Sequence, residues 1–161
     1  MTAQRPLAVI SGVLTAVPDA DTLYVAPLGS SQDLCAVAGT QSTDSTTTVS
    51  VGSILFDPSL FPLTQGSTSR QIKFSVLAFA TTGMTAEVTL YNVTDAVAVT
   101  AANLTTTSTT ITGLLTAALV VPTDLPNSSK LYDIQLRISA GTPGPGDAAV
   151  VRWAGLKVIY V

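Results

Sequence analysis

Residues 132–139 alternate strictly between apolar and polar side chains, and this period of two recurs along the chain. The apolar members, which share one face of an extended strand, are Tyr132, Ile134, Leu136 and Ile138. No stretch of ten or more residues combines a 3.6-residue period with helix formers and helix caps. The chain is therefore predicted to fold from many short strands, as sandwiches and barrels do.

About eight strands are expected in the main body of the chain. They cover residues 49–56, 70–80, 85–94, 96–100, 105–112, 114–121, 131–139 and 150–161. In the last of these, the parity of the apolar residues slips across Ala154 and Gly155, which predicts a β-bulge. Proline and glycine end the ladders at 122–127 and 141–146, which are predicted loops. This predicts an all-β antiparallel sandwich of two sheets, with the strand order left open between a jelly roll and other Greek keys.

The first 45 residues have a different character. Residues 7–17 and 22–26 are predicted to form two short strands, and the polar stretch 39–50 is interpreted as a linker. We therefore expect an N-terminal segment with its linker at 1–45 and a sandwich domain at 46–161. A piece as small as the N-terminal segment cannot bury a core by itself, so we expect it to dock on another subunit or partner.

Few charges are available for recognition of charged partners. The chain carries seven Lys and Arg in total, all scattered singly, so a nucleic-acid surface is not expected. No apolar run approaches the roughly 20 residues that a membrane helix needs. The apolar run near the start is interrupted by Ser11 and Gly12 and follows one basic residue, so no signal peptide is expected.

The residue types that most enzymes and metal sites use are scarce. There is no His, and Glu87 is the single Glu, on a strand face expected to be exposed. One cysteine is too few for a transition-metal site, so Cys35 is interpreted as a small, half-buried apolar side chain. Calcium bound by Asp19 and Asp21 is the alternative that stays open. We expect no catalytic residues, no resident metal and no cofactor.

Carbohydrate binding is a second alternative, because sugar-binding sandwiches present aromatic platforms beside polar groups. Of the nine aromatic residues, Tyr132, Trp153 and Tyr160 fit the inward faces of their strands. Tyr91 and Tyr24 are the two that are expected to be exposed.

The expected surface composition is better suited to an associating protein than to a monomer in solution. Ser and Thr make up a quarter of the chain, with 25 Thr and 15 Ser, whereas charged residues make up 11%. Sheet edges are normally protected by charge, above all by Lys, and this chain has three Lys in total. Packing against further copies or other proteins would bury such edges, so a homo-oligomer is expected.

Two parts of the sequence resemble phage and prophage virion proteins. The opening RPLAVISGVLTAVPDADTLYV is similar to the N-terminal segment of phage neck, tail and fibre proteins, although Ala20 stands where glycine is usual in the element from Ala16 to Leu23. The body, from RQIKFSVLAFATTGMTAEVTLYNVT to the final WAGLKVIYV, resembles the jelly-roll-like modules of virion surface proteins.

This resemblance implies a non-enzymatic virion structural protein of the capsid-decoration or head-fibre type, assembled in the host cytoplasm. It implies attachment to other virion proteins of the capsid or tail through the N-terminal segment, often as a trimer, with a host-surface glycan as a further partner. The expected partner-binding residues are Leu7, Val9, Ile10, Val13, Leu14, Leu23 and Tyr24. A carbohydrate-binding or adhesin module is the alternative.

Overall fold

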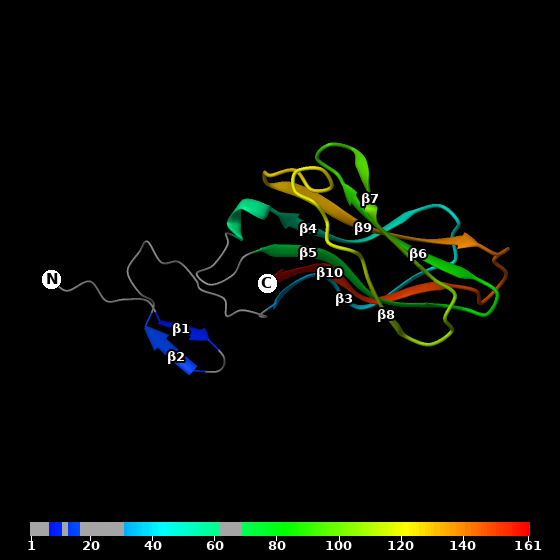
Figure 1. The fold of residues 1–161 in the computed structure, drawn as a ribbon. Helices are drawn as coiled ribbons and strands as arrows, with labels where there is room; N and C mark the ends of the chain where they lie inside the picture. Colours follow the sequence, from blue (N-terminus) through cyan, green and yellow to red (C-terminus); the bar gives the residue numbers. More distant parts are fainter. Residues whose placement is uncertain (1–6, 11–12, 17–30, 62–68) are drawn as a thin grey trace.

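The computed structural model describes residues 7–10, 13–16, 31–61 and 69–161, and this part of the chain is all-β (Figure 1). Eight strands form two facing four-stranded antiparallel sheets, as the sequence predicted. The elements are β1 Leu7–Ile10, β2 Val13–Ala16, β3 Ser31–Thr43, β4 Val49–Phe56, the 3-10 turn η1 Pro58–Leu60, β5 Arg70–Ala80, β6 Thr85–Asn92, β7 Val97–Thr106, β8 Thr112–Leu115, β9 Lys130–Ala140 and β10 Ala149–Tyr160.

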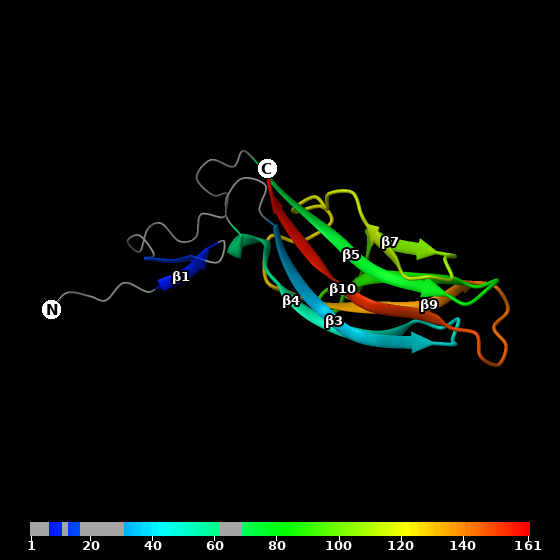
Figure 2. The same cartoon turned by 90° about the horizontal axis from the view of Figure 1, so that it is seen from below.

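The strand order, which the sequence left open, is that of a jelly roll. One sheet has the order β3-β10-β5-β8 and the other has the order β4-β9-β6-β7. The first strand of the sandwich thus pairs with the last, the second with the one before it, and so on inward to β6 with β7. This nesting is what a long hairpin produces when it rolls up into two sheets. In Figure 2, β3, β10 and β5 lie side by side in the sheet nearer the viewer.

The core lies between the inner faces of the two sheets. In β9 the four residues of predicted inward parity, from Tyr132 to Ile138, are all buried, so the strict alternation is confirmed. Opposite them, β5 contributes a buried row that includes Phe74 and Val76. An alternating strand with one wet face is the usual pattern of an antiparallel sandwich.

The predicted irregularity in β10 is confirmed. The register of β10 against β3 shifts between Ala154 and Gly155 and again between Val151 and Trp153. A Cβ atom at Gly155 would lie 2.1 Å from the carbonyl oxygen of Leu34, so the bulge brings the two backbones together where only glycine fits.

The linker predicted at 39–50 is wrong. Residues up to Thr43 belong to β3, which pairs with β10, and β4 begins at Val49. The polar composition arises because β3 is an edge strand whose end is exposed to solvent. Residues 31–43, which the sequence placed in the N-terminal segment, are thus a strand of the sandwich.

Two further strand predictions need correction. Residues 96–100 and 105–112 were expected as separate strands, but β7 spans Val97–Thr106, with an irregular register between Ala98 and Asn103, and residues 107–111 are not in a strand. No proline or glycine separates them, so the ladder resumes after the irregularity. The strand expected at 114–121 is reduced to β8, followed by a single bridge between Leu119 and Ile72.

The N-terminal residues form a hairpin in which β1 pairs with β2 as a two-stranded sheet of its own. A single strand over 7–17 was expected, and this is wrong, because two strands, β1 and β2, lie within this range and pair with each other. The second predicted strand, 22–26, lies outside the described residues.

The sandwich has two ends, which we name by their chain connections. At the proximal end β3 begins, at Ser31 opposite Ile159, and β4 ends at Phe56. At the distal end β3 finishes at Thr43 opposite Ala149. The proximal end is on the left of Figure 1, beside the label of the C-terminus. Within the described residues, no helix is both long and apolar enough to cross a membrane.

Candidate interaction surface

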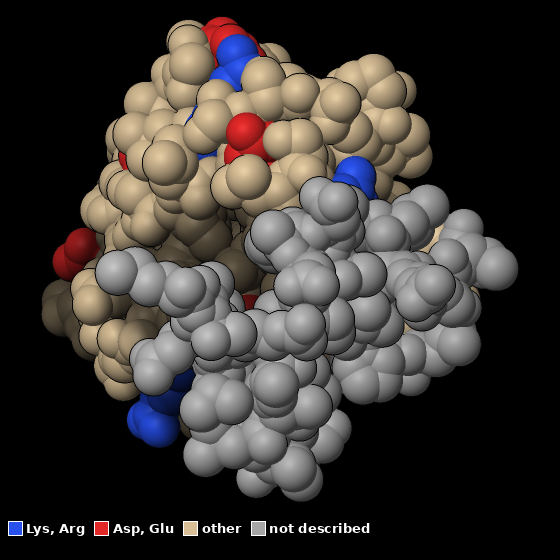
Figure 3. All heavy atoms as spheres, turned by 90° about the vertical axis from the view of Figure 1, so that its left-hand side faces the viewer, with Lys and Arg blue, Asp and Glu red and all other residues tan. Residues whose placement is uncertain are grey.

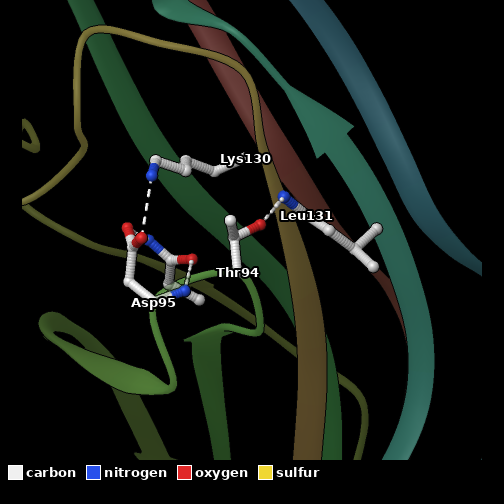
Figure 4. Close-up of polar contacts among 5 residues, drawn as sticks. Thr94, Asp95, Lys130 and Leu131 are labelled. Atoms are coloured by element: carbon white, nitrogen blue, oxygen red, sulfur yellow. Dashed lines mark hydrogen bonds and ion pairs between the residues drawn. The ribbon is translucent and has the colours of Figure 1, made fainter.

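A polar cluster closes the turn between β6 and β7 at the proximal end (Figure 4). Asn92, the last residue of β6, donates from Nδ2 to Asp95 Oδ2 over 2.9 Å and accepts at Oδ1 from the Asp95 backbone N–H over 3.0 Å. Lys130, which begins β9, places Nζ 2.8 Å from Asp95 Oδ1. An Asn side chain can satisfy turn backbone in this way, which explains why this sequence turns here.

The charge of Asp95 is favoured by its neighbours. The hydrogen bond from Lys130 is the main cause that lowers the pKa of Asp95, and the bond from Asn92 lowers it further. Partial desolvation acts in the opposite direction and is outweighed. The cluster therefore holds an ionised carboxylate at ordinary pH.

The same turn is tied to β9 through the backbone. The Leu131 N–H donates to Thr94 Oγ1 over 2.9 Å, and the Val93 N–H donates to the Leu131 carbonyl over 2.9 Å. These bonds continue the β6–β9 pairing past the end of β6 and bring Val93 beside Leu131. The turn is thereby fixed to the sheet rather than free to move away from it.

Three aliphatic residues cross the outer face of the sheet at this point. Leu55 on β4 pairs in register with Leu131 on β9, and Val93 lies on the other side of Leu131. Their exposed fractions are 70% for Leu55, 39% for Leu131 and 38% for Val93. In Figure 4 the Leu131 side chain points towards β4 and away from the Lys130–Asp95 pair. We name these three residues the aliphatic row.

Exposed aliphatic side chains gather at the proximal end as a whole. Of the eleven large hydrophobic side chains that are exposed among the described residues, seven lie there: Leu55, Leu60, Val93, Val97, Val120, Leu131 and Val161. Figure 3 looks onto this end, and its described surface is mostly uncharged, with isolated acidic and basic groups. Such a concentration is typical of an interaction surface, whereas single scattered residues would not be.

A groove of about 290 Å³ lies beside the cluster, between the start of β7 and residues 123–126. Its two carboxylates already have partners, because Asp95 binds Lys130 and Asp124 Oδ2 accepts from the Val120 backbone N–H over 2.7 Å. In the part of the chain that the structure describes, no three His, Cys, Asp or Glu side chains gather as a metal site would need. The walls of the groove combine polar and apolar side chains, and both of its carboxylates are engaged.

Tyr132 lies beneath the cluster with its side chain fully buried. Its hydroxyl group has no hydrogen-bond partner within the described ranges. Desolvation, assisted by the negative charge of Asp95, raises the pKa of Tyr132 to about 12. Burial of the Tyr132 hydroxyl therefore costs free energy that no hydrogen bond among the described residues offsets.

The predicted site residues are only partly located. The five expected partner-binding residues between Leu7 and Leu14 lie on β1 and β2, with Val9 opposite Leu14 and Ile10 opposite Val13. Leu23 and Tyr24 lie outside the described residues, and so do the calcium candidates Asp19 and Asp21.

Other candidates are placed on the sandwich. Glu87 pairs with Arg137 across 2.8 Å on the outer face. Cys35 is exposed, so the half-buried position expected for it is wrong; it lies on the edge strand β3. Of the three aromatics assigned to the core, Tyr132 and Tyr160 are buried and Trp153 is half-buried.

The aliphatic row was missed, although the sequence carried a signal for it. Leu131 has the outward parity of its strand, where Asp133, Gln135 and Arg137 follow, and is therefore an apolar residue on a polar face. The row itself depends on the pairing of β4 with β9, which no local pattern reveals.

Comparison with solved structures identifies similar folds. The structure of the Gt strain of infectious bursal disease virus matches with a TM-score of 0.50 and 14% identity, over 96% of this chain and 37% of that chain. A mutant VP2 protein of the same virus, in derived T=1 particles, matches with a TM-score of 0.50 and 14% identity, over 96% of this chain and 36% of that chain. No family model and no curated protein matches the sequence. The chain thus spans little more than a third of the viral proteins whose fold it shares, and at this identity the likeness establishes the β-sandwich fold.

Proposed function

We propose that this chain is a non-enzymatic structural protein of a virus particle, of the capsid-decoration or head-fibre type. The observation that supports this most directly is the two-sheet β-sandwich, whose fold matches that of the VP2 protein of infectious bursal disease virus over 96% of this chain. Fold alone does not fix function, so the proposal also depends on the surface. Few charges and a concentration of exposed aliphatic residues suit a protein that works within an assembly.

The proposed particle is a bacteriophage, and the N-terminal segment attaches the chain to other virion proteins. The resemblance of residues 5–25 to phage neck, tail and fibre proteins supports this assignment. In this arrangement the sandwich projects outward, and the chain forms a homo-oligomer, a trimer in the simplest case. Its location is the virion.

The absence of an enzymatic role is supported by the chemistry of the available groups. The sequence has no His, and its one Glu is held by Arg137. The carboxylates beside the proximal groove are also engaged, by Lys130 and by backbone N–H. None of these arrangements supplies an acid, a base or a nucleophile with an activating partner.

The test is the solution mass of two chains by light scattering: the full-length protein and a version that begins at Ser31. The shortened chain keeps every strand and every core residue of the sandwich, so it is expected to fold. We expect the full-length protein to form a trimer or a larger assembly and the shortened chain to be monomeric. A monomeric full-length protein, or an unchanged assembly after shortening, would contradict attachment through the N-terminal segment.

Carbohydrate binding is the second candidate, favoured by one feature of the outer face. Tyr91 lies half-buried on β6 in register with Asp133, whose carboxylate accepts a 2.7 Å hydrogen bond from the Ser53 hydroxyl. An aromatic ring beside such a polar pair combines the stacking surface and the hydrogen-bonding groups that sugar binding uses. If the chain is a glycan-binding module, Tyr91→Ala abolishes binding on a glycan array, while Tyr91→Phe preserves the stacking surface and retains it.

A further inference from the structure

The β1–β2 hairpin is incomplete as a structural unit. It consists of eight paired residues in a sheet of its own, whereas an isolated two-stranded hairpin is marginally stable in water. Its strands LAVI and VLTA contain no charged residue, and Thr15 is their one polar residue. A hairpin of this composition needs an uncharged surface to cover it.

The aliphatic row offers such a surface at the correct end of the molecule. Leu55, Leu131 and Val93 present a continuous apolar strip, and Leu60 follows directly after β4 at the same end. The proximal end is also where β3 begins, so the N-terminal segment leaves the sandwich there. The hairpin and the aliphatic row are therefore both apolar, and the row lies at the end of the sandwich from which the N-terminal segment leaves.

The row is held in position rather than adaptable. Leu131 is fixed through Thr94, and Val93 through the Leu131 carbonyl. Asn92 and Lys130 hold Asp95 in the turn that follows. A surface that is ordered before binding loses less conformational entropy when it is covered.

From these observations we propose that the aliphatic row of one copy of this chain receives the β1–β2 hairpin of a second copy. In the single chain the hairpin is not joined to either sandwich sheet, although the 14 residues from 17 to 30 could extend about 50 Å. A second copy is the partner that necessarily carries a matching row. The inference rests on the proposed attachment through the N-terminal segment and names the surface that accepts it.

The contact joins two different surfaces, so each copy gives a hairpin and receives one. Head-to-tail contacts of this kind close into a ring when the rotation between copies permits, and a trimer is a small ring of this type. Unlike a symmetric dimer contact, this arrangement can be reconstituted from two variants with complementary defects.

The test uses sedimentation velocity on full-length variants. Leu55→Asp places a charge in the row, and Leu14→Asp places one in the hairpin; each is expected to raise the dissociation constant about 100-fold and leave monomers. Mixed in equal amounts, the two variants are expected to form a 1:1 dimer, because the intact hairpin of the first fits the intact row of the second. Ile111→Asp, at an exposed aliphatic residue of the distal end, is the control and should assemble as the wild type does.

Three outcomes would overturn the inference: a monomeric wild type, a Leu55→Asp variant that assembles normally, or a mixture that stays monomeric. If Leu55→Asp assembles while Leu14→Asp does not, the attachment through the N-terminal segment stands and only the receiving surface is wrong. If both variants assemble normally, the proposed attachment fails as well.

Discussion

At the distal end the sandwich is closed by polar side chains that satisfy one another, whereas at the proximal end a polar turn supports exposed aliphatic residues. The distal loop is held by Thr81, whose hydroxyl donates to Asp147 Oδ1 over 3.1 Å and accepts from the Ala148 N–H over 2.9 Å. Asp147 Oδ2 also accepts from the Gly144 N–H over 2.9 Å. The proximal turn, built on Asn92, is equally well bonded, but the residues beside it are apolar.

This difference between the two ends indicates which of them leaves apolar surface for a partner to cover. Seven of the exposed large aliphatic residues of the described sandwich lie at the proximal end, against four in its middle and distal parts: Val49, Leu77, Ile111 and Leu115. Water solvates the distal loops without penalty, while the proximal end leaves apolar area that association would bury. Stability and association are thus expected to respond separately to changes at the two ends.

The largest expected effect is at Gly141, in the distal loop. Its φ of +101° is a conformation that only glycine adopts without strain, and an added Cβ would lie 2.7 Å from both the Gly83 carbonyl oxygen and Met84 Sδ. Gly141→Ala is expected to lower the free energy of unfolding by about 3 kcal/mol, measured by urea denaturation.

Gly146 is the matched control for that substitution. Its φ of +92° imposes the same backbone strain, but an added Cβ would meet nothing within 4 Å. Gly146→Ala is therefore expected to cost about 1 kcal/mol. Equal losses at the two positions would show that backbone conformation, and not the close contact, limits the distal loop.

The next effect concerns the proximal turn. Asn92 is 1% exposed and makes both hydrogen bonds to Asp95, so Asn92→Ala is expected to cost about 2 kcal/mol. Asn103→Ala is the control, because Asn103 is exposed and makes one long 3.4 Å bond to Glu87; a change below about 0.5 kcal/mol is expected. A small loss at Asn92 would mean that Lys130 and Thr94 hold the turn without it.

How much of this fold was predictable depends on where each strand lies. The alternation in β9 and the parity slip in β10 were readable because burial on one face imposes a period of two. Of the edge strands, β4 was predicted with its bounds, whereas β3 and β7 were misjudged because their many solvent-exposed residues give a weaker pattern. The jelly-roll order was not predictable, since it depends on pairings between residues as far apart in the sequence as Ser31 and Ile159.

The candidate surface was less predictable than the fold. The N-terminal residues were identified from their apolar composition, but the row that we propose as their receptor is assembled from β4, β9 and the β6–β7 turn. Leu131 stands out as an apolar residue on the polar face of its strand, but Leu55 and Val93 do not stand out within their own segments. They become a surface only through strand register, which is a tertiary property.

A smaller effect is expected from Tyr132, with the opposite sign. Its buried hydroxyl has no partner among the described residues, so Tyr132→Phe is expected to raise the free energy of unfolding by about 1 kcal/mol at neutral pH. Because the pKa of Tyr132 is about 12 in the folded state and about 10 when unfolded, the unfolded state releases this proton first. Wild-type stability should therefore fall as pH rises from 10 towards 12, relative to Tyr132→Phe. Parallel pH profiles for the two proteins would contradict the assigned burial of the hydroxyl.

The smallest effect is expected from the ion pair of the proximal turn. The hydrogen bond from Lys130 lowers the pKa of Asp95, so the pair stabilises the fold above the ordinary value of 3.8, and this contribution is lost as pH falls through the lowered value. Lys130→Met should raise the pKa of Asp95, measured by carbon-detected NMR titration of the carboxyl group. Lys157→Met, which removes the 3.8 Å pair with Asp33 on the other sheet, should leave the titration of Asp95 unchanged. If the pKa of Asp95 stays low in Lys130→Met, the hydrogen bond from Asn92 is what lowers it. The proximal turn would then be held, as the distal loop is, by uncharged hydrogen-bond donors.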